Sequence, residues 1–251
     1  MNKYKVSAVS FYNTLPLVYG LKNSSLIHSI ELTVDNPARC AERLIEGSAD
    51  IGLIPVAAIP LIKNANVFSE YCIGAIGKVR TVILASDIPK NEIKEIFLDS
   101  HSRSSNALVK IMAKEFWKIN VSFRNGYEGF ENIEIKGNTA AVVIGDKAFR
   151  VEKNHKYIYD LAEEWGKFTG LPLVFACWAA NKPLEKEFIR KFDESMNFGL
   201  GHIHEASLTA NLNGLSDYES IEYYLRNNIS FNFDEKKKEA MKLFLELLGG
   251  I

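Results

Sequence analysis

The sequence predicts an α/β fold in two lobes, with mainly parallel sheets and a cleft between the lobes. Short apolar segments alternate with amphipathic ones along most of the 251 residues, which is typical of strands followed by helices. Several apolar segments are continuous rather than alternating, as expected for strands that are covered on both faces. Two extended segments, Thr81–Ala85 and Val174–Trp178, bracket the middle of the chain.

These two segments predict where the chain passes between the lobes. Residues 1–82 together with 178–251 are expected to form one discontinuous lobe, and residues 83–177 the other. The chain is long enough for two lobes of about a hundred residues each. In such an arrangement a ligand binds in the cleft, at the carboxyl ends of the strands.

The first part of the chain contains three predicted strands and two helices. The strands are Lys5–Phe11, Ile30–Val34 and Asp50–Val56. The first helix has Pro16 in its first turn, where proline is tolerated. The second begins at Asn36-Pro37, with asparagine as N-cap and proline at the first helical position, and it ends at Gly47.

The middle of the chain repeats this order. Further strands are expected at Ile93–Leu98, Ala140–Ile144 and Pro172–Ala180. The helix after the first of these carries an apolar face made of Leu108, Ile111, Met112 and Phe116. Asp160 is expected to cap another helix, which ends at Gly170.

The last part of the chain is predicted to be mostly helical. Pro183 begins one helix, and Ser216 with Glu219 forms a capping-box pattern for another. The apolar face of the last helix is formed by Ala240, Leu243, Phe244 and Leu247. The charge run Glu235–Glu239 is interpreted as the solvated face of that helix.

The composition argues against several classes of protein. With 30 Lys+Arg against 31 Asp+Glu, the net charge is −1, which does not suit a nucleic-acid binder or a membrane-surface protein. No stretch approaches eighteen continuous apolar residues, and Asn13, Thr14 and Pro16 interrupt the apolar N-terminal segment, unlike in a signal peptide. The number of cysteines is odd and their spacing is wide, which predicts buried, reduced thiols at Cys40, Cys72 and Cys177. We therefore expect a cytoplasmic protein.

Known catalytic signatures are missing from the sequence. It contains no GxSxG, Walker A, GxGxxG or HExxH motif. The one close pair of histidines, His202 and His204, would point to different faces of a helix. No cysteine begins a helix beside a histidine. We predict neither a metal site nor a cofactor.

Polar residues do gather at the ends of apolar strands. Asn13 and Thr14 follow the first strand, where they either cap a helix or contact a ligand. In the first extended segment, Arg80 and Thr81 would face opposite sides of an alternating strand. Thr81 is expected to face the cleft and Arg80 the solvent.

Three serines and one arginine crowd a predicted helix start, at Ser102, Arg103, Ser104 and Ser105. The helix should begin near Ser104 or Ser105, and the free N–H groups of a helix start bind carboxylates and phosphates. One serine would suffice as a cap, so the additional serines and the arginine favour an anion site. Gly145-Asp146 ends another strand that faces the cleft, and Asp146 either caps the short helix that follows or contributes to the site.

Six segments of the chain, taken in order, resemble one known family. They are SFYNTLPLVYGL, CAERLIEGSADIGLIP, VRTVIL, SRSSNALVKI, VVIGDKA and DLAEEWGKFTGLPLVFACWAA. The family is that of the chorismate dehydratases, which open the futalosine route to menaquinone. The resemblance runs from about residue 5 to residue 181, and NTLPL and TGLPLVFA are its most specific parts. It implies the fold of the type II periplasmic binding proteins.

The resemblance also implies a set of site residues. Asn13 corresponds to an asparagine of the family, and Thr81 stands where a serine is often found; both are expected to be catalytic. The implied substrate-binding residues are Ser102, Arg103, Ser104, Ser105, Gly145 and Asp146. After the third strand this chain has Val56-Ala57-Ala58, so no polar side-chain contact is expected from that loop.

The implied reaction is the conversion of chorismate to 3-[(1-carboxyvinyl)oxy]benzoate and water, without a cofactor. Asp146 and His101 are the nearest acid–base residues in the sequence, but neither has a partner that would tune its pKa. Our hypothesis is that the enolpyruvyl carboxylate of the substrate takes the proton. Two alternatives stay open: the sister dihydroxynaphthoate synthase of the same pathway, and a solute-binding protein without catalytic activity.

Overall fold

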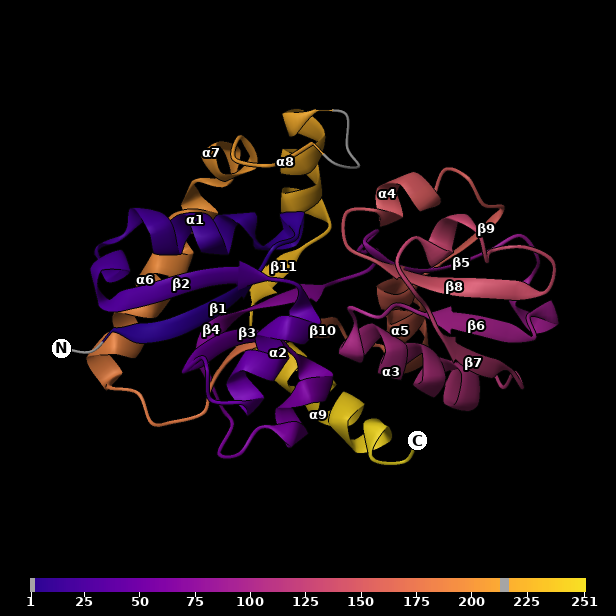
Figure 1. Cartoon of the computed structure of the whole chain (residues 1–251), viewed down its shortest axis with the longest axis horizontal. Coiled ribbons are helices and arrows are strands. Elements are labelled where there is room, and N and C mark those ends of the chain that lie inside the picture. The colour runs from indigo at the N-terminus through magenta and orange to yellow at the C-terminus, as the bar shows by residue number, and fades with distance from the viewer. Residues whose placement is uncertain (1–2, 213–216) are drawn as a thin grey trace.

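A computed structural model describes residues 3–212 and 217–251 of the chain. Two β-sheets lie side by side with helices around each of them, as Figure 1 shows. The α/β fold with two sheets is the one that the sequence predicts.

The first sheet is formed mainly by the two ends of the chain. Its six strands, in spatial order, are β11 (Ser230–Asn232), β4 (Asn66–Ala75), β10 (Leu173–Ala180), β3 (Ile51–Pro55), β1 (Tyr4–Val9) and β2 (Ile30–Asp35). All five residues of β3 are buried, in agreement with the continuous apolar pattern of this segment.

The second sheet is formed by the middle of the chain. Its five strands, in spatial order, are β7 (Ser122–Asn125), β6 (Glu95–Leu98), β8 (Thr139–Ile144), β5 (Val82–Ser86) and β9 (Tyr157–Asp160). All of β5 and the last five residues of β8 are buried.

The prediction of mainly parallel sheets is wrong. Among the described residues, four strand pairings are parallel, and five are antiparallel. The cause is the long strand β10, which returns from the middle of the chain and enters the first sheet between β3 and β4, antiparallel to both. β5 is likewise antiparallel to both of its neighbours.

The helices begin largely where the sequence places their caps. They are α1 (Leu15–Asn23), α2 (Pro37–Ile45), α3 (Arg103–Ile111), α4 (Ala148–Val151), α5 (Leu161–Thr169), α6 (Lys186–Gly201), α7 (Ile203–Ser207), α8 (Tyr218–Asn227) and α9 (Glu235–Leu248). The side chain of Asn36 accepts the N–H of Arg39, and Asp160 accepts two N–H groups of α5, so both predicted N-caps are confirmed.

Two of the predicted helix starts are not confirmed. The start at Pro183 is wrong, because α6 begins only at Lys186. Ser216 lies outside the described residues; the cap of α8 is Asp217, whose Oδ1 accepts the N–H of Ser220 at 2.6 Å.

The interpretation of residues 235–239 as a solvated face is wrong for Lys237, which is fully buried. Its Nζ donates to the carbonyl of Asn232 at 2.7 Å and to Oδ2 of Asp234 at 3.3 Å. The aliphatic part of the side chain lies over Gly74 of β4, where a Cβ would leave only 3.1 Å to Cε. A long amphipathic side chain can thus lie in the core while its ammonium group keeps polar partners.

The lobe boundaries of the sequence analysis, 1–82 with 178–251 and 83–177, stay a prediction. We propose that each sheet marks one lobe. Since β5 begins at Val82 and all of β10 pairs in the first sheet, the chain would then cross near Thr81 and again near Pro172.

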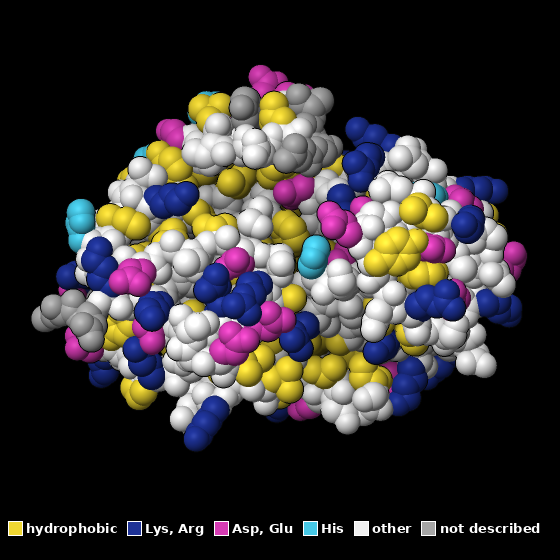
Figure 2. All heavy atoms as spheres, viewed as in Figure 1, with side chains coloured by type: hydrophobic (Ala, Val, Ile, Leu, Met, Phe, Trp, Pro, Cys, Tyr) yellow, Lys and Arg dark blue, Asp and Glu magenta, His cyan; other side chains and the backbone are white. Residues whose placement is uncertain are grey.

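The surface carries charges of both signs without a large patch of either on the face that Figure 2 shows. No helix within the described ranges is long and apolar enough to span a membrane. The three cysteines are free and buried, as the sequence predicts.

Candidate functional site

A small cavity of about 60 Å³ lies between the two sheets, at the ends of β1, β3 and β8. Its apolar wall is formed by Val9, Phe11, Pro37, Leu53, Pro55, Ile73, Val82, Ile144, Phe175 and Ala176. Gly145 and six polar residues complete it, namely Asn13, Thr14, Thr81, Ser102, Ser104 and Ser105. The prediction that strand ends from both halves of the chain meet at one site agrees with this geometry.

No titratable side chain lines this cavity within the described part of the chain. The polar groups on its wall are hydroxyls and one amide, which can donate and accept hydrogen bonds but do not change charge near neutral pH. His101, one of the two candidate bases, is exposed and is not part of the wall. General acid–base catalysis by a protein side chain therefore has no candidate on the wall itself.

The three serines at the start of α3 have different partners. Ser102 is the N-cap, and its Oγ accepts the N–H of Ser105 at 3.1 Å. Ser104 donates its hydroxyl to the carbonyl of Phe175 in β10 at 3.0 Å and accepts the N–H of Ala57 at 3.2 Å, so it links α3 to the first sheet and the turn after β3. The hydroxyl of Ser105 has no hydrogen-bond partner among the described residues and stays available to the cavity.

The first turn of α3 also offers backbone donors. The N–H groups of Arg103 and Ser104 receive no side-chain acceptor from the described residues, as is usual for a first helical turn. The loop before it is held by Asp99, a fully buried carboxylate that pairs with Lys147 at 2.9 Å and accepts the N–H of His101 at 3.0 Å. This fixed loop aims the positive end of the helix dipole at the cavity.

Arg103 does not line the cavity. Its guanidinium lies 4.0 Å from the carboxylate of Glu42, and its side chain lines a wider hollow of about 600 Å³ on the other side of Ser102. A residue directly after an N-cap points away from the side on which its neighbours Ser104 and Ser105 lie, because successive helical residues are about 100° apart. Any contribution of Arg103 to an anion in the cavity would therefore be indirect.

Asn13 and Thr14 belong to a 3₁₀ turn, Tyr12–Thr14, that follows β1. The hydroxyl of Thr14 donates to the carbonyls of Val9 and Phe11, at 2.6 and 2.7 Å, and fixes the turn. Oδ1 of Asn13 is buried without a partner among the described residues. A buried acceptor without a partner is uncommon and often marks a functional position. Thr14 is thus structural, whereas Asn13 keeps an acceptor for a ligand.

Thr81 lines the cavity, but the segment before it is not an alternating strand. Arg80 has a left-handed backbone, with φ of 64°, and its N–H donates to Oδ2 of Asp160 at 2.6 Å. Its guanidinium pairs with Glu152 and lies 5.0 Å from the ring of Phe149, while the side chain stays 35 % exposed, in agreement with a surface charge. Thr81 itself is 1 % exposed, and its Oγ1 lies 2.7 Å from the hydroxyl of Tyr224.

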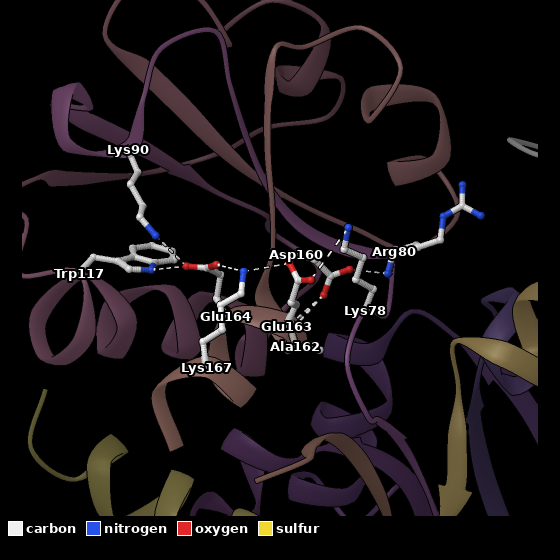
Figure 3. Close-up of polar contacts among 9 residues, drawn as sticks. All are labelled: Lys78, Arg80, Lys90, Trp117, Asp160, Ala162, Glu163, Glu164 and Lys167. Atoms are coloured by element: carbon white, nitrogen blue, oxygen red, sulfur yellow. Dashed lines mark hydrogen bonds and ion pairs between the residues drawn. The ribbon is translucent and has the colours of Figure 1, made fainter. Parts of the chain in front are cut away.

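A chain of polar contacts along α5 holds Lys78 and Arg80, just before Thr81, in place (Figure 3). Besides Arg80, Asp160 accepts the N–H groups of Ala162 and Glu163, at 3.0 and 3.2 Å. Burial raises the pKa of Asp160, and these backbone N–H groups act in the opposite direction. One carboxylate thus caps α5 and fixes the left-handed residue next to Thr81.

Gly145 and Asp146 connect the second sheet to the turn after β1. Gly145 has φ of 69°, and a Cβ there would lie 2.8 Å from the ring of Phe11, so only glycine permits this approach. Oδ1 of Asp146 accepts the N–H of Tyr12 at 3.1 Å. Asp146 neither caps α4 nor lines the cavity. Its observed role is to join the two halves of the site.

Replacing Asp146 with asparagine should flatten the pH dependence of stability. Burial raises the pKa of Asp146 from 3.8 to about 7, although the N–H of Tyr12 acts in the opposite direction. Protonated Asp146 therefore contributes fully to the free energy of unfolding at pH values below the pKa that this carboxyl has in the unfolded chain. That contribution is lost as pH rises through about 7. Asparagine keeps the acceptor and cannot ionise. In urea unfolding at pH 8, the variant should exceed wild type by about 2–4 kcal/mol, with a difference within about 1 kcal/mol at pH 4.

The exposed Glu128 supplies a matched control for this experiment, because Glu128→Gln removes a charge without a buried environment. Its effect should be equally small at both pH values. An Asp146→Asn effect that is the same at pH 4 and pH 8 would contradict the expectation.

Some residues of the site were missed by sequence reasoning. Phe11 and Phe175 form apolar walls, and Tyr224 contacts Thr81 from behind. Thr81 and Tyr224 are 143 positions apart in the chain, and no local pattern indicates such a contact. The segments SFYNTLPL and TGLPLVFA, which contain the two phenylalanines, were the only signal.

The fold is that of the periplasmic binding proteins. The Candida albicans CA3427 gene product, described as having the generic periplasmic binding protein fold, superposes with a TM-score of 0.64 at 15 % identity, over 100 % of this chain and 91 % of the other. At such low identity, this similarity shows the fold alone.

The sequence profile of the menaquinone biosynthesis family matches residues 4–249, so the chain belongs to this family. A chorismate dehydratase from Thermus thermophilus is 23 % identical over 273 residues, covering 99 % of this chain and 96 % of the relative. A second one, from Campylobacter jejuni, is 24 % identical over 247 residues, covering 95 % of this chain and 94 % of the relative.

Proposed function

We propose that the protein is a chorismate dehydratase, a hydro-lyase that forms 3-[(1-carboxyvinyl)oxy]benzoate and water. The observation that carries this proposal is the cavity wall, which offers hydroxyls, an amide and a helix N-terminus but no titratable side chain. Membership of the menaquinone biosynthesis family and the two relatives named chorismate dehydratase support the same activity.

The proposed reaction needs stabilisation of charge more than a protein base. Loss of the ring proton beside the enolpyruvyl ether leaves an electron pair that is conjugated through the ring alkene to the ring carboxylate. The pair then expels the neighbouring hydroxyl, and the proton and the hydroxide leave together as water. We place the ring carboxylate at the first turn of α3, where the backbone N–H of Ser104 and the hydroxyl of Ser105 can donate to it. Hydrogen-bond donors that are held where negative charge develops often make the largest contribution to lowering the activation barrier.

The proton acceptor in this proposal is the enolpyruvyl carboxylate of the substrate. Asp146, the carboxylate in the turn after β8, accepts the N–H of Tyr12 and stays outside the wall. Asn13 and Thr81 would orient the enolpyruvyl group and donate a hydrogen bond to the departing hydroxyl. Asn13 lines the cavity from the turn after β1, and Thr81 lines it from the position directly before β5.

Substrate entry in this proposal requires the two halves of the site to separate. The cavity of about 60 Å³ is far smaller than the 300–1,000 Å³ of typical ligand sites. The contacts that would have to open include those of Ser104 with Phe175 and Ala57, at 3.0 and 3.2 Å, and that of Tyr12 with Asp146, at 3.1 Å. Such closure around a ligand is the usual motion of two-lobed proteins.

The test is to incubate purified protein with chorismate, without added metal or nucleotide, and to follow the ultraviolet spectrum. The product is then identified by mass spectrometry, with heat-inactivated protein as the control for spontaneous decay. Steady formation of the aromatic product at substoichiometric protein supports the proposal. Unchanged chorismate overturns it, and conversion of cyclic dehypoxanthine futalosine instead would identify the sister enzyme.

A further inference from the structure

One buried hydroxyl contacts a residue that is proposed to act on the leaving group. Oη of Tyr224 lies 2.7 Å from Oγ1 of Thr81, which lines the cavity. Tyr224 is 1 % exposed and does not line the cavity. It therefore lies directly behind the wall, out of reach of a ligand but in contact with Thr81, which a ligand would touch.

The direction of this hydrogen bond follows from what each group can do. Oγ1 of Thr81 has one proton, and it donates to the carbonyl of Val79 at 3.5 Å. Burial holds the pKa of Tyr224 well above its usual range, so the phenol keeps its proton. In the short contact between the two hydroxyls, the phenol is therefore the donor and Thr81 the acceptor.

Thr81 is then left with a proton of its own. The other acceptor within reach, the carbonyl of Val79, lies 3.5 Å from Oγ1, at the long limit of a hydrogen bond. The contact from Tyr224 to Thr81 thus leaves a hydroxyl donor at the cavity wall, while Asn13 keeps a free acceptor on the same wall. A hydroxyl that leaves a ring carbon needs a hydrogen-bond donor, and the Thr81 hydroxyl can be that donor.

Packing from both halves of the molecule fixes the phenol ring. Tyr224 lies in α8, which follows the capped turn at Asp217, and its ring meets Phe149 of α4 edge to face, with centroids 5.1 Å apart. Figure 1 shows α8 beside the first sheet and α4 beside the second. The ring position therefore depends on both sheets, while the hydroxyl adds the polar contact with Thr81.

We propose that Tyr224 is a positioning residue, which sets the direction of the Thr81 hydroxyl through its own hydrogen bond and thereby aims a donor at the leaving group. This inference rests on the proposed dehydratase function. It assigns Tyr224 no contact with the substrate, so the loss of its hydroxyl should affect the chemical step and leave substrate binding nearly unchanged.

The test is Tyr224→Phe, which removes the hydroxyl and keeps the ring against Phe149. The expected result is a kcat lowered about 10- to 30-fold with KM within about threefold of wild type. Tyr223→Phe, the same change at the next position of α8, is the matched control because Tyr223 is 63 % exposed. Circular dichroism and thermal unfolding of each variant show whether the fold is kept, and a merely structural role would lower Tm without this split between kcat and KM.

A second arm places Tyr224→Phe in a Thr81→Val background, which lacks the hydroxyl that Tyr224 is proposed to aim. The additional loss should be less than about twofold, because residues that act as one unit are not additive. Full kcat in Tyr224→Phe, a change in KM alone, or losses that multiply in the double variant would each overturn the role of Tyr224. Wild-type protein that leaves chorismate unchanged would instead overturn the proposed function, so the two failures are distinguishable.

Discussion

Asn13→Ala is expected to lower kcat about 10²-fold or more, with a smaller change in KM. Asn13 lines the cavity, and its Oδ1 is a buried acceptor without a partner among the described residues. Steady-state kinetics with chorismate, followed at the aromatic product, measure the effect.

Asn23→Ala is the matched control, because Asn23 is an exposed asparagine at the end of α1 whose amide donates to the carbonyl of Tyr19. Its activity should equal that of wild type within about twofold. If Asn13→Ala kept full turnover, the assignment of Asn13 to the reaction would be wrong, whatever the activity of the protein.

Gly199→Ala is expected to destabilise the fold by about 3 kcal/mol or more, the upper end of what overpacking usually costs. A Cβ at Gly199 would lie 1.9 Å from the carbonyl oxygen of Pro16, and one at Gly20 would lie 2.0 Å from that of Ser195. Helices α1 and α6 therefore cross with their backbones in contact. Because the obstacle is backbone and not a flexible side chain, α1 must move as a whole.

Gly201→Ala in the last turn of the same helix is the control, since a Cβ there meets nothing within 4 Å. It should be neutral or slightly stabilising, because alanine is the better helix former. Urea unfolding of both variants measures the difference. The α1 shift should also lower activity in Gly199→Ala, since α1 directly follows the turn that carries Asn13. Equal unfolding midpoints for the two variants would contradict the close crossing.

Local signals predicted the helix caps and the buried strands well. Asn36-Pro37, Asp160 and the strand at residues 51–55 each follow from a cap or an apolar run within a few residues. β4, β7, β9 and β11 were missed, and their residues are largely half-buried or exposed, with mixed polarity. Their pairing depends on distant strands, which no local pattern records.

The candidate site was predicted in its residues but not in their roles. Reading three serines as one anion site is reasonable from sequence, yet Ser104 became a link to β10 and Ser102 a cap that accepts an N–H, while Ser105 kept its whole hydroxyl for the cavity. These differences arise from long-range partners such as Phe175. Lys237 combines both kinds of partner, because its ammonium group donates to the nearby carbonyl of Asn232 while its aliphatic part packs on the distant Gly74 of β4.

The absence of titratable side chains from the described cavity wall also bears on how catalysis arises in this fold. If the wall only holds, orients and polarises the bound molecule, then the reacting groups are those of the bound molecule itself. A receptor that carries a stable solute and an enzyme that converts an unstable one could then share nearly the same interior. A binding protein of this fold could then become an enzyme by binding a different ligand, without gaining new catalytic side chains. Few mutations would separate the two activities.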